Sequence, residues 1–341
     1  MRTVQGTRHI EGAAVVEAAR DGDRWAFGAL AERHRAELLL HCYRMLGSLE
    51  DAEDAVQETF LRAWDKRATF QGRAPFRAWL YGIATHASLD AIARLRRRPP
   101  AALAGARGRA EVAWLQPYPD RLLEQVAPDD EPEEALVARE TVELAFLVAI
   151  QHLPPTQRAV LIVRDLLGWS AKETAALLES SVASVNSSLQ RARATLRRRL
   201  PEPRLEAAPV ADPSEAEREL LRRYMEASER DDVEALARMM REDARFSMPP
   251  SPEVHVGREA ILACWVEGGF GSAAFGRLRC LPTRANLQPA VANYVRRPGD
   301  SRYRPMALDV LRIEDGLLAE IVAFTPDLFP AFGLPPALAR D

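Results

Sequence analysis

The stretch SVASVNSSLQRARATLRRR, residues 181–199, has the pattern of a helix with two different faces. Val185, Leu189, Ala192 and Leu196 recur at helical spacing and form one apolar stripe, which predicts that this side packs on a core. The opposite side carries short polar side chains near its start and arginines toward its end. Side chains of these types suit contacts with base edges and phosphates, so we expect this face to meet nucleic acid.

The residues before this helix complete a helix-turn-helix pattern. Ser170 and Glu173 fit a capping box that begins a preceding helix, and a turn is expected at Glu179–Ser181. An isolated arginine-rich helix would be interpreted as a solvated surface helix, but the capped helix and tight turn before it favour DNA binding. The expected DNA contacts are Ser184, Asn186, Ser187, Gln190, Arg191, Arg193, Arg197 and Arg198.

Charge is segregated along the chain, although the formal net charge of the 341 residues is only −3. RLRRR at 94–98 and the end of the quoted helix are basic, whereas EQVAPDDEPEE at 124–134 is acidic. The near-neutral total therefore does not argue against nucleic-acid binding. The length predicts two or three domains.

Several classes of protein are not indicated by the composition. No run of 18 apolar residues and no leader-like N-terminal segment is present, so we expect no membrane association and a cytoplasmic location. Cys42, Cys264 and Cys280 are far apart and lack CxxC spacing, which predicts free thiols. Neither a metal site nor a cofactor is expected.

Two proline-rich stretches divide the chain into a multidomain protein. The expected domains are a helical bundle at 12–98, a flexible acidic linker at 99–133, the helix-turn-helix domain at 134–200, a linker at 201–214 and an α+β domain at 215–330.

Local signals predict the ends of the N-terminal helices. Asp23 is a plausible N-cap of a helix that ends at Leu46, where Gly47 can adopt a left-handed conformation. Ser48 fits the N-cap of the next helix, and a third helix is expected from Pro75 to Arg98.

The C-terminal domain has helical patterns first and alternating, strand-like segments afterwards. Asp315-Gly316 lies between two of these segments and is a strong hairpin signal. We expect a curled antiparallel sheet that packs against the preceding helices.

Two segments resemble a known family. LPPTQRAVLIVRDLLGWSAKETAALLESSVASVNSSLQRARATLR is similar to region 4 of extracytoplasmic-function sigma factors, and SLEDAEDAVQETFLRAWDKRATFQGRAPFRAWLYGIATHASLDAIARLRRR is similar to region 2. The C-terminal domain resembles the SnoaL-like domain, a cone-shaped barrel of curved sheet, which some of these sigma factors carry. The resemblance implies a sigma-70 family subunit that directs promoter-specific initiation and whose C-terminal domain modulates its activity.

The resemblance also implies partners and roles for particular residues. The partners are promoter DNA and core RNA polymerase, through its β′ clamp and β flap. The quoted helix would read the minus-thirty-five element, and His86 stands where the family often has asparagine. The residues expected at the polymerase are Asp51, Asp54, Gln57 and Glu58. Those expected at the minus-ten element are Arg73, Arg77, His86, Arg94, Arg96 and Arg97.

Other functions remain open for the C-terminal domain. A small unknown ligand would fit a pocket lined by Phe246, Met248, His255, Trp265 and Tyr294. No spacing pairs titratable groups for catalysis, so we expect no enzyme activity. The alternatives are a stand-alone helix-turn-helix regulator with a ligand-sensing domain, and a SnoaL-type enzyme fused to a DNA-binding module.

Overall fold

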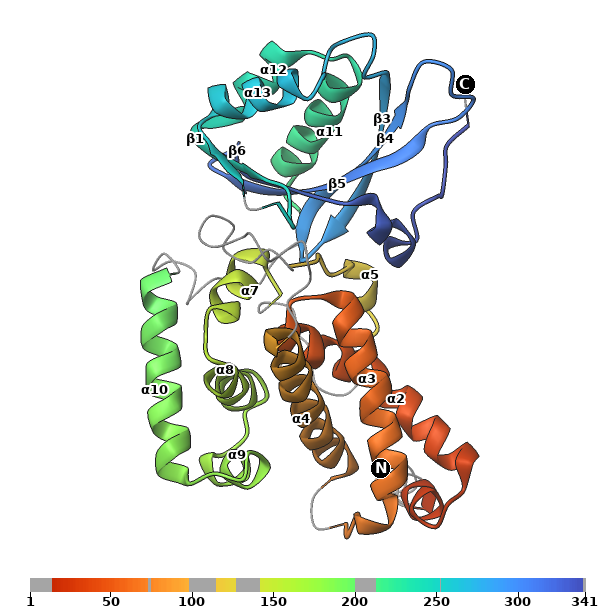
Figure 1. Cartoon of the computed structure of the whole chain (residues 1–341), viewed down its shortest axis with the longest axis vertical. Coiled ribbons are helices and arrows are strands. Elements are labelled where there is room, and N and C mark those ends of the chain that lie inside the picture. Colours follow the sequence, from red (N-terminus) through yellow and green to blue (C-terminus); the bar gives the residue numbers. More distant parts are fainter. Residues whose placement is uncertain are drawn as a thin grey trace, which may run out of the picture. The chain divides into compact units, whose positions relative to one another are not determined.

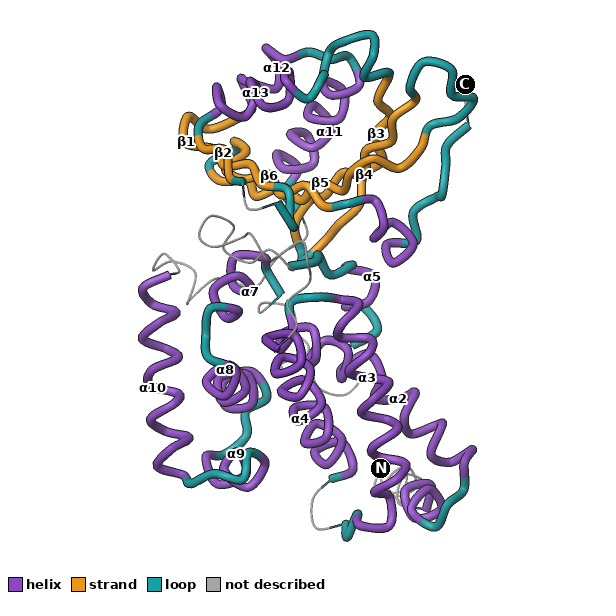
Figure 2. Tube along the Cα trace, in the orientation of Figure 1, coloured by secondary structure: helices purple, strands orange, loops and turns teal. Residues whose placement is uncertain are grey.

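The computed structural model describes residues 14–72, 75–97, 115–126, 142–199, 213–251 and 253–339. The chain forms two compact units, and each is assembled from separate stretches of sequence. The first comprises Met1–Pro99, Leu122–Thr141 and Ala149–Leu205, and the second comprises Pro100–Arg121, Val142–Val148 and Glu206–Asp341. In the described residues the strands belong to the second unit (Figure 2). None of the helices there is both long enough and apolar enough to cross a membrane.

Three helices form the N-terminal bundle of the first unit, and their ends lie where the sequence predicts them. They are α2 (Arg24–Leu46), α3 (Leu49–Lys66) and α4 (Phe76–Arg97). The Asp23 carboxylate accepts hydrogen bonds from the backbone N–H groups of Trp25 and Ala26, and Gly47 ends α2 with a φ of 76°. The Ser48 hydroxyl caps α3.

A polar side chain is buried in this bundle. His41 on α2 lies 2.9 Å from the hydroxyl of Thr85 on α4, measured from its Nε2. Burial, and secondarily the charge of Arg44, lowers the pKa of His41 to about 3, so the imidazole is neutral at physiological pH.

The helix-turn-helix domain belongs to the first unit from Ala149 onward, and its described helices have the predicted pattern. They are α7 (Leu144–Gln151), α8 (Pro155–Leu161), a π-helical turn η3 (Ile162–Leu166), α9 (Ala171–Leu177) and α10 (Val182–Arg199). The capping box of Ser170 and Glu173 is present, and Glu179 has a φ of 47°. The predicted stripe on α10 is buried.

A polar joint links the helix-turn-helix domain to the bundle. The side-chain amide of Gln151 donates to the backbone carbonyl oxygen of Arg44 at 3.0 Å. The buried guanidinium of Arg158 donates to the backbone carbonyl oxygen of Met45. These carbonyls belong to the end of α2, which has no further helical turn to satisfy them. Gly47 leaves room for the joint, because a Cβ there would lie 3.0 Å from the Gln151 side chain.

Six strands form the sheet of the second unit, in the order β2-β1-β6-β5-β4-β3. The elements are α11 (Glu215–Glu229), α12 (Val233–Met239), β1 (Met240–Ser247), β2 (Val254–Val256), α13 (Arg258–Glu267), β3 (Arg277–Ala285), β4 (Gln288–Arg296), β5 (Arg304–Glu314), β6 (Leu317–Phe324) and η5 (Pro326–Phe332).

One expectation about this sheet is wrong, since β1 runs parallel to β6 and the sheet is mixed. A hairpin turn fixes the direction of two consecutive strands, but β1 and β6 are separated by a helix and four other strands. The predicted hairpin at Asp315-Gly316 is confirmed, with both residues at positive φ between the antiparallel strands β5 and β6.

Helices α11, α12 and α13 cover one face of the sheet (Figure 1). Within this core, Tyr224 on α11 and Asn293 on β4 both donate hydrogen bonds to the carboxylate of Asp309 on β5, at 3.0 and 2.6 Å. Burial raises the pKa of Asp309 to about 6, although both hydrogen bonds act in the opposite direction.

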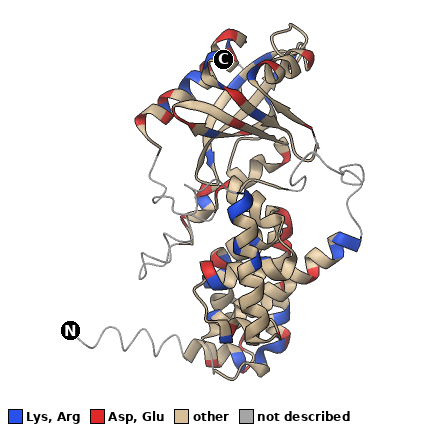
Figure 3. Ribbon diagram, turned by 90° about the vertical axis from the view of Figure 1, so that its left-hand side faces the viewer, with Lys and Arg blue, Asp and Glu red and all other residues tan. Residues whose placement is uncertain are grey.

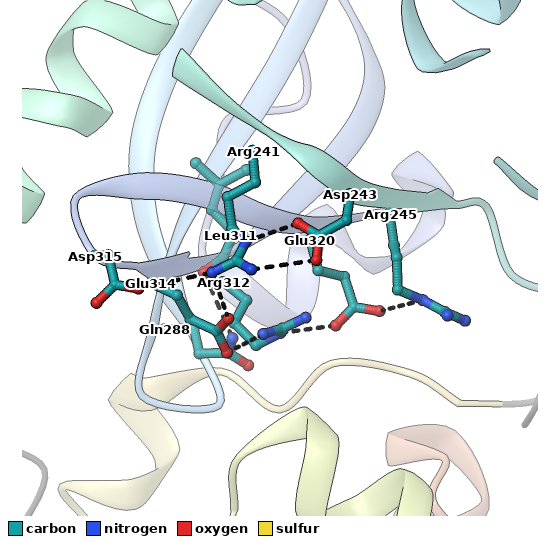
Figure 4. A network of polar contacts seen from close by, with 9 residues as sticks. All are labelled: Arg241, Asp243, Arg245, Gln288, Leu311, Arg312, Glu314, Asp315 and Glu320. Carbon is teal, nitrogen blue, oxygen red and sulfur yellow. Dashed lines mark hydrogen bonds and ion pairs between the residues drawn. The ribbon is translucent and has the colours of Figure 1, made fainter. Parts of the chain in front are cut away.

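Charged side chains extend across β1, β5 and β6 (Figure 4). The Arg312 guanidinium lies 3.0 Å from a Glu320 oxygen and also contacts Glu314. Arg241 lies 2.8 Å from Asp243 and 3.6 Å from Glu314. These ion pairs link the parallel pair of strands to the antiparallel part of the sheet.

Part of the connector that follows the N-terminal bundle belongs to the second unit. Asn286, at the turn between β3 and β4, bonds both backbone groups of Tyr118 and donates from its side chain to Val142 at 2.6 Å. Asp120 accepts hydrogen bonds from the Leu287 backbone and from the Arg284 guanidinium. One turn of the C-terminal domain therefore holds two points of the chain that lie between the bundle and the helix-turn-helix.

Candidate nucleic-acid and polymerase interfaces

The polar face of α10 is open to solvent. All eight side chains predicted to contact DNA are exposed, while the apolar stripe is buried. The hydroxyl of Ser181, which the prediction did not include, accepts from the backbone N–H of Ser184 at 3.1 Å and caps the helix. Arg197–Arg199 form a basic last turn, and Figure 3 colours the lysine and arginine positions along the ribbon in blue.

The arginines of α10 differ in their surroundings. The Arg193 guanidinium makes a bidentate pair with Asp165, at 2.9 Å from Nε and 2.7 Å from Nη2. The charge of Arg193 is therefore partly neutralised by its own domain. No ion pair to Arg191, Arg197 or Arg198 occurs among the described residues.

The predicted minus-ten residues are divided between the two ends of α4. Arg77 and His86 line a cleft of about 1120 Å³ in the first unit, together with Gln71, Phe70 and Trp79. Phe70 and Trp79 also pack together, with ring centroids 5.4 Å apart. These aromatic rings are therefore both part of the core and part of the wall of the cleft.

The remaining predicted cations do not join this cleft. Arg94, Arg96 and Arg97 are exposed in the last turn of α4. At 1.5 Å per residue, this turn is roughly 25–30 Å along the helix from Arg77. Arg73 lies outside the described residues.

Glu37 positions Arg77, and sequence patterns gave no signal for this pairing. The Arg77 Nε lies 2.6 Å from one Glu37 oxygen, the Tyr81 hydroxyl donates to the same oxygen, and His34 bonds the other. Burial acts to raise the pKa of Glu37, but the hydrogen bond from His34 and the charge of Arg77 outweigh it, so that the pKa is lowered. Glu37 is 40 residues from Arg77, which is beyond the reach of local spacing rules.

The opposite wall of the cleft comes from the helix-turn-helix domain. Asp165, Trp169, Glu173 and Glu179 line it, so that acidic side chains face the side of α4 that carries Arg77. In this arrangement the cleft face of α4 is opposed by another part of the same chain.

The acidic face of α3 has the predicted spacing. Asp54 and Gln57 are exposed, and Asp51 and Glu58 are partly buried. Burial raises the pKa of Asp51, and the Glu58 carboxylate pairs with Arg62 at 2.7 Å. Leu61 extends the same face by one turn and is 64% exposed, which adds an apolar contact point that the prediction missed.

The side chains predicted to line a pocket in the C-terminal domain do not all meet. Phe246 contacts Trp265, with centroids 5.5 Å apart, and lies beside His255. Met248 is 39% exposed. Tyr294 is buried against Phe329, and its hydroxyl donates to Pro335. The structure thus brings together three of the five.

Three family models match the chain in sequence order. They are Sigma-70 region 2 at residues 30–98, Sigma-70 region 4 at 143–196, and the SnoaL-like domain at 221–321. The first two cover the bundle and the helix-turn-helix, and the third covers most of the helices and sheet of the second unit.

Whole-chain comparisons agree with these matches. The chain is 42% identical over 330 residues to the ECF RNA polymerase sigma factor SigG of Mycobacterium tuberculosis, covering 93% of this chain and 86% of SigG. It is 30% identical over 190 residues to SigW of Bacillus subtilis, covering 54% of this chain and 94% of SigW. The crystal structure of the M. tuberculosis extracytoplasmic-function sigma factor SigJ has the same fold, with a TM-score of 0.57, 22% identity, and coverage of 91% and 99%. The chain belongs to the extracytoplasmic-function RNA polymerase sigma factors and carries a C-terminal SnoaL-like domain.

Proposed function

We propose that this sigma factor binds core RNA polymerase in the cytoplasm and recruits it to promoters through two separate DNA contacts. The α10 face would enter the major groove of the minus-thirty-five element, where Asn186, Gln190 and Arg191 offer the donors and acceptors that read base edges. The observation that carries this assignment is the full exposure of the predicted contacts beside a fully buried stripe.

The minus-ten contact is assigned to the cleft face of α4. Arg77 supplies a cation, and Phe70 and Trp79 supply aromatic surface, which together suit an unpaired base and its backbone. Because Asp165, Glu173 and Glu179 oppose this face, single-stranded DNA would reach it after the helix-turn-helix domain has moved away.

The polymerase contact is assigned to the α3 face of Asp51, Asp54, Gln57 and Glu58, with the β′ clamp as its partner, and the helix-turn-helix domain is assigned to the β flap. The exposed Leu61 supports an interface on this side of α3, because interfaces combine an apolar centre with a polar rim.

We assign the modulation of initiation by the SnoaL-like domain to the hydrogen bonds that it makes with the connector. Asn286 bonds Tyr118 and Val142, so this domain restrains the chain between the two sigma regions. A change in that restraint would alter how far the two regions can separate on a promoter.

The proposal is tested by transcription in vitro with purified bacterial core polymerase and a promoter library. Gln190→Ala should change the preferred minus-thirty-five sequence, and Asp54→Arg should weaken core binding. Glu53→Arg is the matched control, because Glu53 is an exposed carboxylate about 100° around the same helix. Failure of the folded wild-type chain to direct initiation, or equal losses in Asp54→Arg and Glu53→Arg, would contradict the assignments.

The role of the C-terminal domain is tested in the same assay by a chain that ends after Pro203. A changed initiation rate with an unchanged promoter preference would support modulation. Equal initiation rates for the full and the truncated chain would contradict a modulating role of the C-terminal domain.

A further inference from the structure

A niche of about 420 Å³ lies on the second unit and shares no residue with the interfaces assigned above. Its walls are the loop at 271–273, the facing ends of β3 and β4, and the side chain of Asp231. Arg277, Arg296 and Arg297 line it, so three basic residues surround one acidic residue, Asp231. The niche therefore has a positive charge and a concave shape.

The arrangement of two of these arginines is electrostatically unfavourable by itself. Arg277 and Arg296 are directly opposite in the antiparallel pairing of β3 and β4, which places both side chains on the same face. Like charges at such positions destabilise a strand pair. Asp231 lies 3.8 Å from Arg277. Among the described residues no carboxylate makes an ion pair with the guanidinium of Arg296 or Arg297, and Asp300 accepts a hydrogen bond from the backbone N–H of Arg297 at 3.2 Å.

Arg296 is held in place without using all of its donors. Its guanidinium lies 5.4 Å from the centroid of the Tyr303 ring, a cation–π contact that fixes its position. Its Nε is buried and has no hydrogen-bond partner among the described residues. The terminal Nη groups of Arg296 are not among the buried atoms, so they are the donors that an incoming oxyanion would meet.

The backbone around the niche depends on glycine. Gly276 has a φ of +100°, and a Cβ there would lie 2.4 Å from the carbonyl oxygen of Arg296. The loop therefore lies directly against the end of β4 and forms a fixed wall beside the arginines.

We propose that this niche binds a small phosphate-bearing molecule, with Arg296 as the central anchor and Arg277 and Arg297 beside it. Guanidinium groups bind phosphate oxygens through paired, charge-assisted hydrogen bonds. The volume exceeds that of a single phosphate and falls in the range of small-molecule pockets, so an organic portion also fits. Asp231, whose Oδ2 lies 3.8 Å from Arg277, lines the niche and would accept a hydrogen bond from a hydroxyl group of that portion. A concave site of this size favours a small ligand over the extended backbone of duplex DNA.

Isothermal titration of the full chain tests the proposal, with inorganic phosphate and ribose 5-phosphate as probes and ionic strength held constant with sodium chloride. We expect ribose 5-phosphate to bind more tightly than inorganic phosphate. Arg296→Gln should weaken the binding of both by about tenfold or more, because it removes a charge-assisted contact. Arg223→Gln is the matched control, because Arg223 is exposed on α11 and does not line the niche. Arg297→Gln is a second test in case Arg296→Gln does not fold.

Three results would overturn the proposal. One is the absence of measurable binding of either probe to the wild-type chain. Another is equal affinity of the wild-type chain and of the folded niche variants. The third is a loss in those variants of affinity for duplex DNA alone, which would make the arginines part of a nucleic-acid surface instead.

Discussion

Asp309 is a buried carboxylate whose ionisation opposes folding of the C-terminal domain. Its pKa is raised to about 6 from an ordinary 3.8, so the folded domain binds this proton more tightly than the unfolded chain. The stabilising contribution is complete below about pH 4 and is lost as the pH rises through 6. Asp309→Asn should remove this dependence, about 3 kcal/mol, and stabilise the domain at pH 8. Urea unfolding at pH 5 and pH 8 measures about 1.4 kcal/mol of this dependence, and the same difference in the wild type and in Asp309→Asn would contradict the prediction.

His41 gives the N-terminal bundle the opposite pH dependence. Its pKa is lowered to about 3 from 6.5, so protonation favours the unfolded chain. The stabilisation is complete above about pH 6.5 and is lost as the pH falls toward 3, with a total on the order of 5 kcal/mol. His41→Gln keeps a donor for Thr85 but cannot be protonated in this range. The acid-unfolding curve of His41→Gln, followed by circular dichroism, should therefore be shallower than that of the wild type. Parallel curves for the two proteins would refute the explanation.

Residues whose roles depend on near neighbours could be predicted, and those that depend on distant contacts could not. Asp23, Ser48 and Ser170 were predicted as caps because a cap bonds a backbone group within three residues. The burial of Asp309 and the support that Glu37 gives Arg77 depend on partners brought together by tertiary packing. No local spacing reports such partners.

Helix α10 carries arginines whose contributions to DNA binding can be compared with one another. Arg197 has no ion-pair partner among the described residues, whereas Arg193 already pairs with Asp165. Under the proposed DNA contact, Arg197→Gln should lower the slope of log affinity against log salt by about 0.9, the value for one phosphate contact. Arg193→Gln should change the slope less. Fluorescence anisotropy of promoter DNA over a salt series measures both, and equal changes would show that the Asp165 pair does not persist on DNA.

The direction of strand β1 shows where prediction of elements fails. The sequence indicates most of the strands and their hairpins, because alternation and Asp315-Gly316 are local signals. The parallel pairing of β1 with β6 depends on the path of the whole domain, including α13. The cross-strand ion pairs of Arg312 and Arg241 belong to that same long-range arrangement.

At the scale of the whole first unit, Gln151 controls how firmly the two sigma regions are joined. Its amide bonds the end of α2 and also accepts a hydrogen bond from Arg158. Gln151→Ala removes both contacts, so amide hydrogen exchange at the end of α2 should become faster. Binding of promoter DNA to the free chain should also become faster. Gln157→Ala, a half-buried glutamine on α8, is the control, and similar exchange in both variants would argue against a specific joint.

The grip of Asn286 on Tyr118 and Val142 has a consequence for how this family can vary. A chain segment whose two ends are fixed loses entropy only as the logarithm of its length, so doubling it costs about 0.6 kcal/mol. By this relation, an insertion between these two residues that leaves Asp120 and its contacts in place costs little stability, as long as the ends can still reach the same turn. Because Asn286 fixes Tyr118 and Val142, the positions of these two residues do not depend on the number of residues between them. Evolution can therefore change the length of the connector without moving its ends.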